Sequence, residues 1–363
     1  MDERRGLVMV SDPDLLDSIL RLAAAAGCEL HRAVDPTQAR RHWHVAPVVV
    51  LDAPAAQRCA RSGLPRRPGV VIAVLGEPAE DVWRLAVAVG ADHVCSLPQA
   101  EQWLVATLAD AAEGPPRRGA VLAVVGGRGG AGASVFAAAV AVTAARAGDR
   151  ALLVDCDPLG GGIDLVLGAE DLDGLRWPHV VIDGGRVPAA ALHAALPMPP
   201  VPAGRAGLAV LSCDRSRHVP SPGAVRSVLE SGRRAGDIVI CDVPRYPTDA
   251  VAAALGLADL TVLVVPADVR SCAAAARVAT GLTDFGAPIR LVVRGPSPGG
   301  VTPEEVARSL DLPILATMRP EPGLARALER GQAPGRRRGP LATAAGRVLA
   351  ALRPSAAPPG AAA

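Results

Sequence analysis

An apolar segment at residues 120–125 runs directly into a glycine-rich stretch and then into an alanine-rich segment. The apolar segment predicts a buried strand, and the alanine-rich segment predicts a helix. Glycines at a strand-to-helix turn allow several backbone N–H groups to converge on the oxygens of one phosphate. We therefore expect a phosphate-binding loop, with Gly129, Gly130 and Gly132 as backbone donors and Ser134 as a Mg²⁺ ligand.

This loop lacks the lysine that normally completes such a site. Ala133 occupies the position from which a lysine would reach the β- and γ-phosphates of a nucleotide. No other lysine replaces it, because all 38 basic residues of the chain are arginine. The loop therefore predicts nucleotide binding without the group that usually secures the transferring phosphate.

Composition excludes several classes of protein. A net charge of +2 gives no reason to expect a specific nucleic-acid partner. The seven cysteines form no CxxC pair, which argues against a disulfide framework and a zinc site. The sequence shows neither a signal-like apolar start nor an apolar run of about 18 residues. We expect a soluble cytoplasmic protein with at most peripheral contact to a membrane.

Two blocks of the chain alternate apolar strands with helical segments, which predicts two parallel sheets. We expect an α/β, receiver-like domain of flavodoxin type over residues 1–113 and a linker at 114–119. A doubly wound P-loop domain is expected over 120–353, followed by a disordered tail at 354–363. Predicted strands lie at 7–10, 48–51, 70–75, 93–96, 120–125, 151–154, 208–211, 238–241, 261–265, 289–293 and 314–316.

Acidic residues follow two of the predicted strands. Asp155 and Asp157 end one strand, and Asp242 ends another. Because carboxyl ends of parallel strands share one sheet edge, Asp155 and Asp157 are predicted to orient the attacking water or a Mg²⁺-bound water, and Asp242 to hold the Mg²⁺ shell. We expect Asp164 and Asp268 to be solvated or helix-capping residues.

The same loop permits a second interpretation. Gly127, Gly129 and Gly132 match the GxGxxG dinucleotide fingerprint, with Asp155 as the ribose-binding acid. This alternative would make the protein an NAD-dependent enzyme. It ranks last, because no substrate domain or catalytic His/Lys group accompanies the fingerprint.

Three motifs carry a resemblance to a known superfamily. Residues 128–134, Asp155-x-Asp157 and Asp242-x-Pro244 resemble the deviant Walker A, Walker A′ and Walker B motifs of the MinD/ParA ATPases. Within that superfamily, the chain resembles the actinobacterial CpaE-like proteins called septum site-determining protein Ssd. The resemblance implies nucleotide binding through Arg128, Gly129, Gly130, Ala131, Gly132, Ala133, Ser134 and Val135.

The resemblance also implies ATP or ADP with Mg²⁺ as cofactor and a nucleotide-dependent homodimer. In these relatives one lysine binds phosphate in its own subunit, and a second reaches across the dimer. Arg128 keeps the charge of the second lysine, whereas Ala133 keeps nothing of the first. Backbone N–H groups and the helix dipole remain, so we expect binding with weak or lost hydrolysis.

Residues 9–13, 48–52 and 90–98 resemble a response-regulator receiver domain, with Asp52 at the phosphoacceptor position. Of the paired acids only Asp12 remains, and Leu97 stands where a lysine is usual. Because a phosphorylated aspartate needs a metal ion and a cation nearby, we expect an inactive pseudo-receiver used for docking.

The family resemblance predicts the biological role. It implies a regulator of septum site determination and cell division, recruited to the septum or the inner membrane face and partnered by division proteins. The alternative is a CpaE-like localisation factor for a pilus or secretion system.

Overall fold

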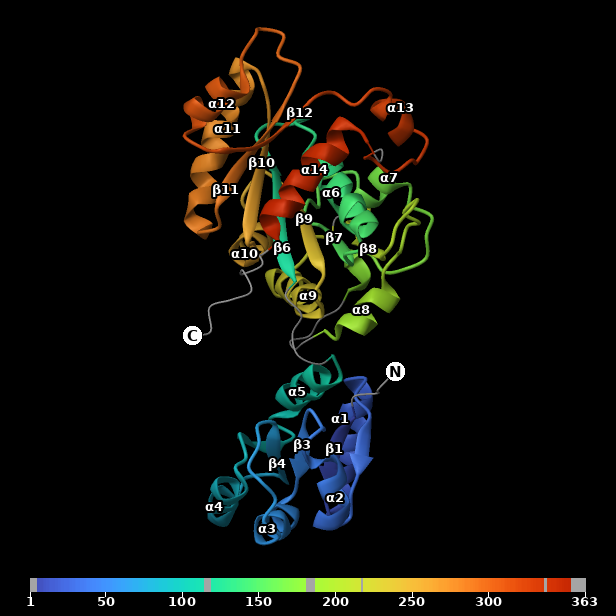
Figure 1. Cartoon of the computed structure of the whole chain (residues 1–363), viewed down its shortest axis with the longest axis vertical. Coiled ribbons are helices and arrows are strands. Elements are labelled where there is room, and N and C mark those ends of the chain that lie inside the picture. The colour runs from blue at the N-terminus through green and yellow to red at the C-terminus, as the bar shows by residue number, and fades with distance from the viewer. Residues whose placement is uncertain (1–4, 114–118, 181–186, 217, 336–337, 354–363) are drawn as a thin grey trace, which may run out of the picture. The chain divides into compact units, whose positions relative to one another are not determined.

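The computed structural model describes residues 5–113, 119–180, 187–216, 218–335 and 338–353 (Figure 1). The chain divides into two compact units, one made of residues 1–116 with 183–190 and one of 117–182 with 191–363. Most of the expected linker, residues 114–118, and the expected tail at 354–363 lie outside the described residues.

The first unit contains a five-stranded parallel sheet in the order β2-β1-β3-β4-β5, the flavodoxin-like arrangement. Its helices cover both faces, with α1 and α5 on one side and α2, α3 and α4 on the other. The strands are β1 (Gly6–Met9), β2 (Leu30–Arg32), β3 (Val49–Leu51), β4 (Val70–Leu75) and β5 (His93–Leu97). The helices are α1 (Pro13–Ala25), α2 (Pro36–Trp43), α3 (Ala53–Arg61), α4 (Glu80–Val89) and α5 (Glu101–Glu113).

The second unit contains a seven-stranded parallel sheet in the order β12-β11-β10-β6-β9-β7-β8. Each strand of this sheet lies at a predicted position. The strands are β6 (Ala120–Gly126), β7 (Ala151–Asp155), β8 (Leu208–Leu211), β9 (Ile238–Val243), β10 (Leu260–Pro266), β11 (Ile289–Arg294) and β12 (Ile314–Met318). Residues 120–125 are all buried, as expected of a central strand that is covered on both faces.

Helices α6 and α14 lie side by side and pack their alanine, valine and leucine side chains against one face of this sheet (Figure 1). Helices α9 and α10 contact each other and also contact β6 and β9. The helices are α6 (Ala133–Ala147), α7 (Ile163–Leu167), α8 (Ala189–Ala195), α9 (Pro222–Ala235), α10 (Asp249–Leu257), α11 (Val269–Leu282), α12 (Pro303–Leu310), α13 (Leu324–Leu328) and α14 (Pro340–Leu352), with 3₁₀ turns η1 (Trp177–His179) and η2 (Thr283–Phe285).

The strand order separates the two interpretations of the glycine-rich loop. Strand β9 lies between β6, which leads into the loop, and β7, which ends at Asp155. In dinucleotide-binding folds of order 3-2-1-4-5-6, the strand that carries the ribose-binding acid pairs directly with the strand before the glycines. The observed order therefore argues against the NAD-dependent alternative.

Candidate functional site

The glycine-rich loop connects β6 to α6 at the carboxyl edge of the second sheet. Gly130 has a φ of +71° and Gly132 a φ of +92°, so both positions favour glycine. Helix α6 begins after Gly132 without a capping side chain. Its first N–H groups and the positive end of its dipole therefore remain available for an anion.

The loop forms one wall of a cavity of about 270 Å³. Strand β9 and the residues after β7 supply the other walls, so three chain segments that are far apart in sequence meet here. The lining residues are Gly126, Arg128, Gly129, Gly130, Ala131, Gly132, Ala133, Ser134, Val135, Asp157, Asp242, Val243, Pro244 and Arg245. The cavity thus combines backbone donors, a hydroxyl, two carboxylates and two guanidinium groups.

Ser134 and Asp242 lie together in this cavity. The Ser134 hydroxyl forms a hydrogen bond with the Asp242 carboxylate, which is 6% exposed. Burial, followed by repulsion from Asp155, raises the pKa of Asp242 to about 7. A hydroxyl and a carboxylate are the oxygen ligands that Mg²⁺ takes beside nucleotide phosphates and water. The pair therefore fits a Mg²⁺ ion.

Asp155 lies beside Asp242 on the neighbouring strand but does not line the cavity. Its carboxylate is 2% exposed and accepts hydrogen bonds from the backbone N–H groups of Asp157 (3.0 Å), Ile163 (2.9 Å) and Cys213 (3.2 Å). Burial raises its pKa to about 6. These contacts hold the backbone of the loop after β7 in place. The water-orienting role of Asp155 remains a prediction.

Asp157 reaches the cavity wall and is held by a residue that sequence reasoning missed. The Tyr246 hydroxyl donates a hydrogen bond to the Asp157 carboxylate at 2.5 Å. Burial and this contact raise the pKa of Tyr246. Tyr246 is the only tyrosine of the chain and lies four residues after Asp242. This proximity to a predicted site residue was the one sequence feature that could have pointed to it. It links the loop after β9 to the loop after β7.

Sequence comparison places the chain among known proteins. It is 49% identical over 348 residues to the uncharacterised protein Rv3660c of Mycobacterium tuberculosis strain H37Rv, which covers 95% of this chain and 97% of that protein. The same values hold for the uncharacterised protein MT3760 of strain CDC 1551. The chain belongs to the Rv3660c-like family. The family description "Rv3660c-like, CheY-like N-terminal domain" matches residues 9–115 of this protein.

The second unit of this Rv3660c-like protein matches a different family and a solved structure. The description "Cellulose biosynthesis protein BcsQ" fits residues 120–283. The cell division ATPase MinD of Pyrococcus furiosus shares the fold, with a TM-score of 0.52, 19% identity, and coverage of 64% of this chain and 99% of that one. A CheY-like domain followed by a P-loop domain of MinD/ParA fold is therefore confirmed.

In this Rv3660c-like protein Arg128 is held within its own chain. Its Nε donates to the Ser271 hydroxyl at 2.7 Å, and its Nη1 donates to the Gly129 carbonyl at 3.1 Å. Its Nη2 lies 3.9 Å from the Asp268 carboxylate. Asp268 caps α11 by accepting from the Ser271 N–H, as its predicted capping role requires. Arg128 thus rests on the start of α11.

Arg294, the last residue of β11, also holds the loop. No function was predicted for it from the sequence, yet its Nη1 donates to the Ala131 carbonyl at 3.1 Å and approaches the Gly130 carbonyl at 3.5 Å. These contacts hold the loop through its carbonyl groups and engage none of its N–H groups.

The expectation for Asp164 was wrong. Asp164 is fully buried rather than solvated, and it caps no helix. Its carboxylate pairs with Arg176 at 3.1 Å and with Arg215 at 3.0 Å. These partners lie 12 and 51 residues away, so no local pattern could reveal them. Next to Arg176, Trp177 is buried and donates its Nε1–H to the Asp155 carbonyl at 2.6 Å.

In the CheY-like unit Asp52 is fully engaged by backbone groups. One carboxylate oxygen accepts from the Ala55 N–H at 2.7 Å and caps α3. The other accepts from the N–H groups of Ser11 at 2.5 Å and Asp12 at 3.3 Å. The side chain is 4% exposed. Asp52 therefore fastens the β1–α1 loop, and its inactivity as a phosphoacceptor remains a prediction.

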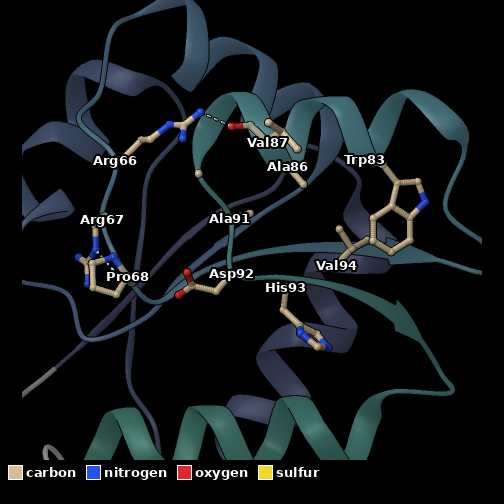
Figure 2. A pocket seen from close by; sticks show the side chains of 11 residues that line it. Arg66, Arg67, Pro68, Trp83, Ala86, Val87, Ala91, Asp92, His93 and Val94 are labelled. Carbon is tan, nitrogen blue, oxygen red and sulfur yellow. Dashed lines mark hydrogen bonds between the residues drawn. The ribbon is translucent and has the colours of Figure 1, made fainter.

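A separate hollow lies on the CheY-like unit between α4, the start of β5 and the chain before β4 (Figure 2). Its volume is about 800 Å³. Trp83 is 53% exposed beside it, and the Arg66 guanidinium donates to the Val87 carbonyl at 2.6 Å. Arg67 also donates to backbone carbonyls, those of Trp43 and Pro68. The hollow thus combines an apolar wall on α4 with the Asp92 carboxylate and with arginines that already donate to backbone carbonyls.

The described part of the chain holds no group of three or more His, Cys, Asp or Glu side chains in a metal-binding arrangement. A Mg²⁺ ion at Ser134 and Asp242 would accordingly depend on phosphate and water for its other ligands. No helix there combines the length and the apolar character that crossing a bilayer requires.

Proposed function

We propose that this protein is a nucleotide-binding regulator of the MinD/ParA type that acts in septum site determination. Mg²⁺ with ATP or ADP is the proposed ligand of the cavity at the carboxyl edge of the second sheet. The observation that carries the proposal is the meeting of the glycine-rich loop, Ser134 and Asp242 in that one cavity.

The residues present favour binding over turnover. The loop N–H groups and the start of α6 would hold the phosphates, and Ser134 with Asp242 would hold Mg²⁺. When bound, Mg²⁺ neutralises charge on the phosphate oxygens. The absence of a lysine at Ala133 removes a contact to the transferring phosphate, which lowers a hydrolysis rate by about 10²–10⁴. Nucleotide occupancy would then control dimerisation or partner binding rather than drive rapid cycles.

The role in division rests on likeness rather than on site geometry. The three nucleotide motifs resemble those of septum site-determining proteins, and the MinD of Pyrococcus furiosus, a cell division ATPase, shares the fold. Division proteins at the septum or inner membrane face are the proposed partners. A depletion and overexpression experiment tests this part by measuring cell length and septum placement. Unchanged septation would contradict it, and loss of surface pili with normal septation would favour the secretion alternative.

Calorimetric titration of the full chain tests the biochemical part. Mg-ATP and Mg-ADP should bind, and NADH should not. Ser134→Ala and Asp242→Asn should weaken the dependence of binding on Mg²⁺, because each removes a proposed ligand. Ser309→Ala is the matched control, since Ser309 only donates to the Val306 carbonyl within α12. Binding of NADH without binding of either Mg-nucleotide would overturn the proposal.

A further inference from the structure

Arg245 is the third arginine beside the phosphate-binding loop, and it differs from the other two in its contacts. Arg128 is bound to Ser271 and Asp268, and Arg294 is bound to loop carbonyls. Within the described part of the chain, no hydrogen bond or ion pair engages the Arg245 guanidinium, and the residue is exposed. Arg245 therefore offers all its donors to whatever enters the cavity.

The Arg245 guanidinium lies directly over the start of the loop. Its Nη2, Cζ and Nη1 atoms are 3.4, 3.7 and 3.8 Å from the position that a Cβ on Gly129 would take. A Cβ at Gly129 would be in ordinary van der Waals contact with the guanidinium, which therefore lies close to the loop backbone. Arg245 lines the same cavity as Ser134, Asp157 and Asp242.

The segment that carries Arg245 is anchored on both sides of it. Pro244 is buried, and the Tyr246 hydroxyl donates to the Asp157 carboxylate. Thr248 then caps α10 by accepting from the Val251 N–H at 3.1 Å. The loop after β9 therefore holds its backbone in place while the Arg245 side chain remains free to adjust to a ligand.

We propose that Arg245 supplies, within the same chain, the phosphate-binding cation that the loop lacks at Ala133. The ligand class is a nucleoside di- or triphosphate, because the missing lysine is the group that reaches the β- and γ-phosphates. A planar guanidinium binds two phosphate oxygens at once, which suits this task from its position beside Gly129, in the wall of the cavity that Ala133 also lines. The inference rests on the proposed nucleotide binding and names the residue that selects polyphosphates.

Calorimetry on the full chain with Mg-ATP, Mg-ADP and AMP tests this inference. Arg245→Ala should weaken binding of Mg-ATP and Mg-ADP by about 10- to 100-fold, because a charge-assisted hydrogen bond is lost, and change AMP binding less than threefold. Arg226→Ala is the matched control, since Arg226 is exposed on α9 and does not line the cavity. Adding Ala133→Lys to Arg245→Ala should restore tight binding of the polyphosphates.

The outcomes separate this inference from the proposed function. If the parent chain binds Mg-ATP and Arg245→Ala binds it equally well, the role of Arg245 is refuted while nucleotide binding stands. An equal loss of affinity for AMP and for ATP would also refute it, because the cation would then not select the outer phosphates. If the parent binds no nucleotide, the proposed function itself fails. Unchanged thermal unfolding of ligand-free Arg245→Ala shows that the variant is folded.

Discussion

The buried carboxylate of Asp164 should be a major determinant of the stability of the P-loop unit. Asp164→Asn keeps the shape of the side chain but removes the charge that faces Arg176 and Arg215. Removing one partner of a buried ion pair costs about 3–5 kcal/mol. Arg176 retains carbonyl acceptors at Ala169, Glu170, Leu172 and Gly174. Arg215 is 46% exposed and adds little. We therefore expect the lower end, about 3 kcal/mol, or roughly a hundredfold in the unfolding equilibrium.

The assay must report on the P-loop unit alone, because a chain of two units does not unfold in one step. Trp177 is the only one of the four tryptophans that lies in this unit; the others are Trp43, Trp83 and Trp103. Labelling with 5-fluorotryptophan gives a separate ¹⁹F resonance for each, and Trp177→Phe identifies the one to follow in a urea titration. The urea concentration at which half of the native Trp177 resonance is lost measures unfolding of the unit that contains Asp164.

Asp149→Asn provides the matched control. Asp149 pairs with Arg353, but both side chains are partly exposed at 31% and 47%, so the expected loss is at most about 1 kcal/mol. If Asp164→Asn destabilises the unit no more than Asp149→Asn does, the buried ion pair does not stabilise the fold and the reasoning is refuted.

Three further substitutions test other parts of the structure. Phe136→Ala should lower the free energy of unfolding of the P-loop unit by about 3–5 kcal/mol in a urea titration, because Phe136 is fully buried. Val269 is exposed, so Val269→Ala should change the same free energy by less than about 0.5 kcal/mol. Asp52→Ala should destabilise the CheY-like unit by about 0.5–2 kcal/mol, because the side-chain cap of α3 is lost. Acetyl phosphate should phosphorylate neither the parent protein nor this variant, and phosphorylation of the parent alone would contradict the predicted inactivity of Asp52. Gly132→Ala should weaken Mg-ATP binding in calorimetry by straining a residue at φ +92°, and unchanged affinity would show that the loop conformation is not needed.

The sheets were predictable from sequence because their strands are apolar and bounded by clear turn signals. All seven strands of the second sheet were located from such runs. Strand β2 in the first sheet was not located, because its sequence Leu-His-Arg is too short and too polar to show a sustained apolar period. The order of the strands in the sheet could not be predicted from local sequence patterns either, because it depends on pairing between distant segments. That order nevertheless decided between the P-loop and dinucleotide interpretations.

The site was predictable where chemistry follows directly after a strand. Ser134 and Asp242 were identified in this way, and the structure brings them together. Tyr246 and Arg245 were missed, because a loop sequence does not show where its side chains point. The pairing of Asp164 was mispredicted for a related reason, since its burial depends on arginines brought from distant segments by the fold.

The resting place of Arg128 bears on how readily two copies of this protein could associate. An arginine that must reach a neighbouring copy's nucleotide has first to leave the buried Ser271 hydroxyl and the partly exposed Asp268 carboxylate, of which the ion pair with Asp268 is worth about 1 kcal/mol or less. These contacts favour the inward position of the Arg128 side chain, so an arginine that reached outward would first lose about 1–2 kcal/mol of interaction with the start of α11.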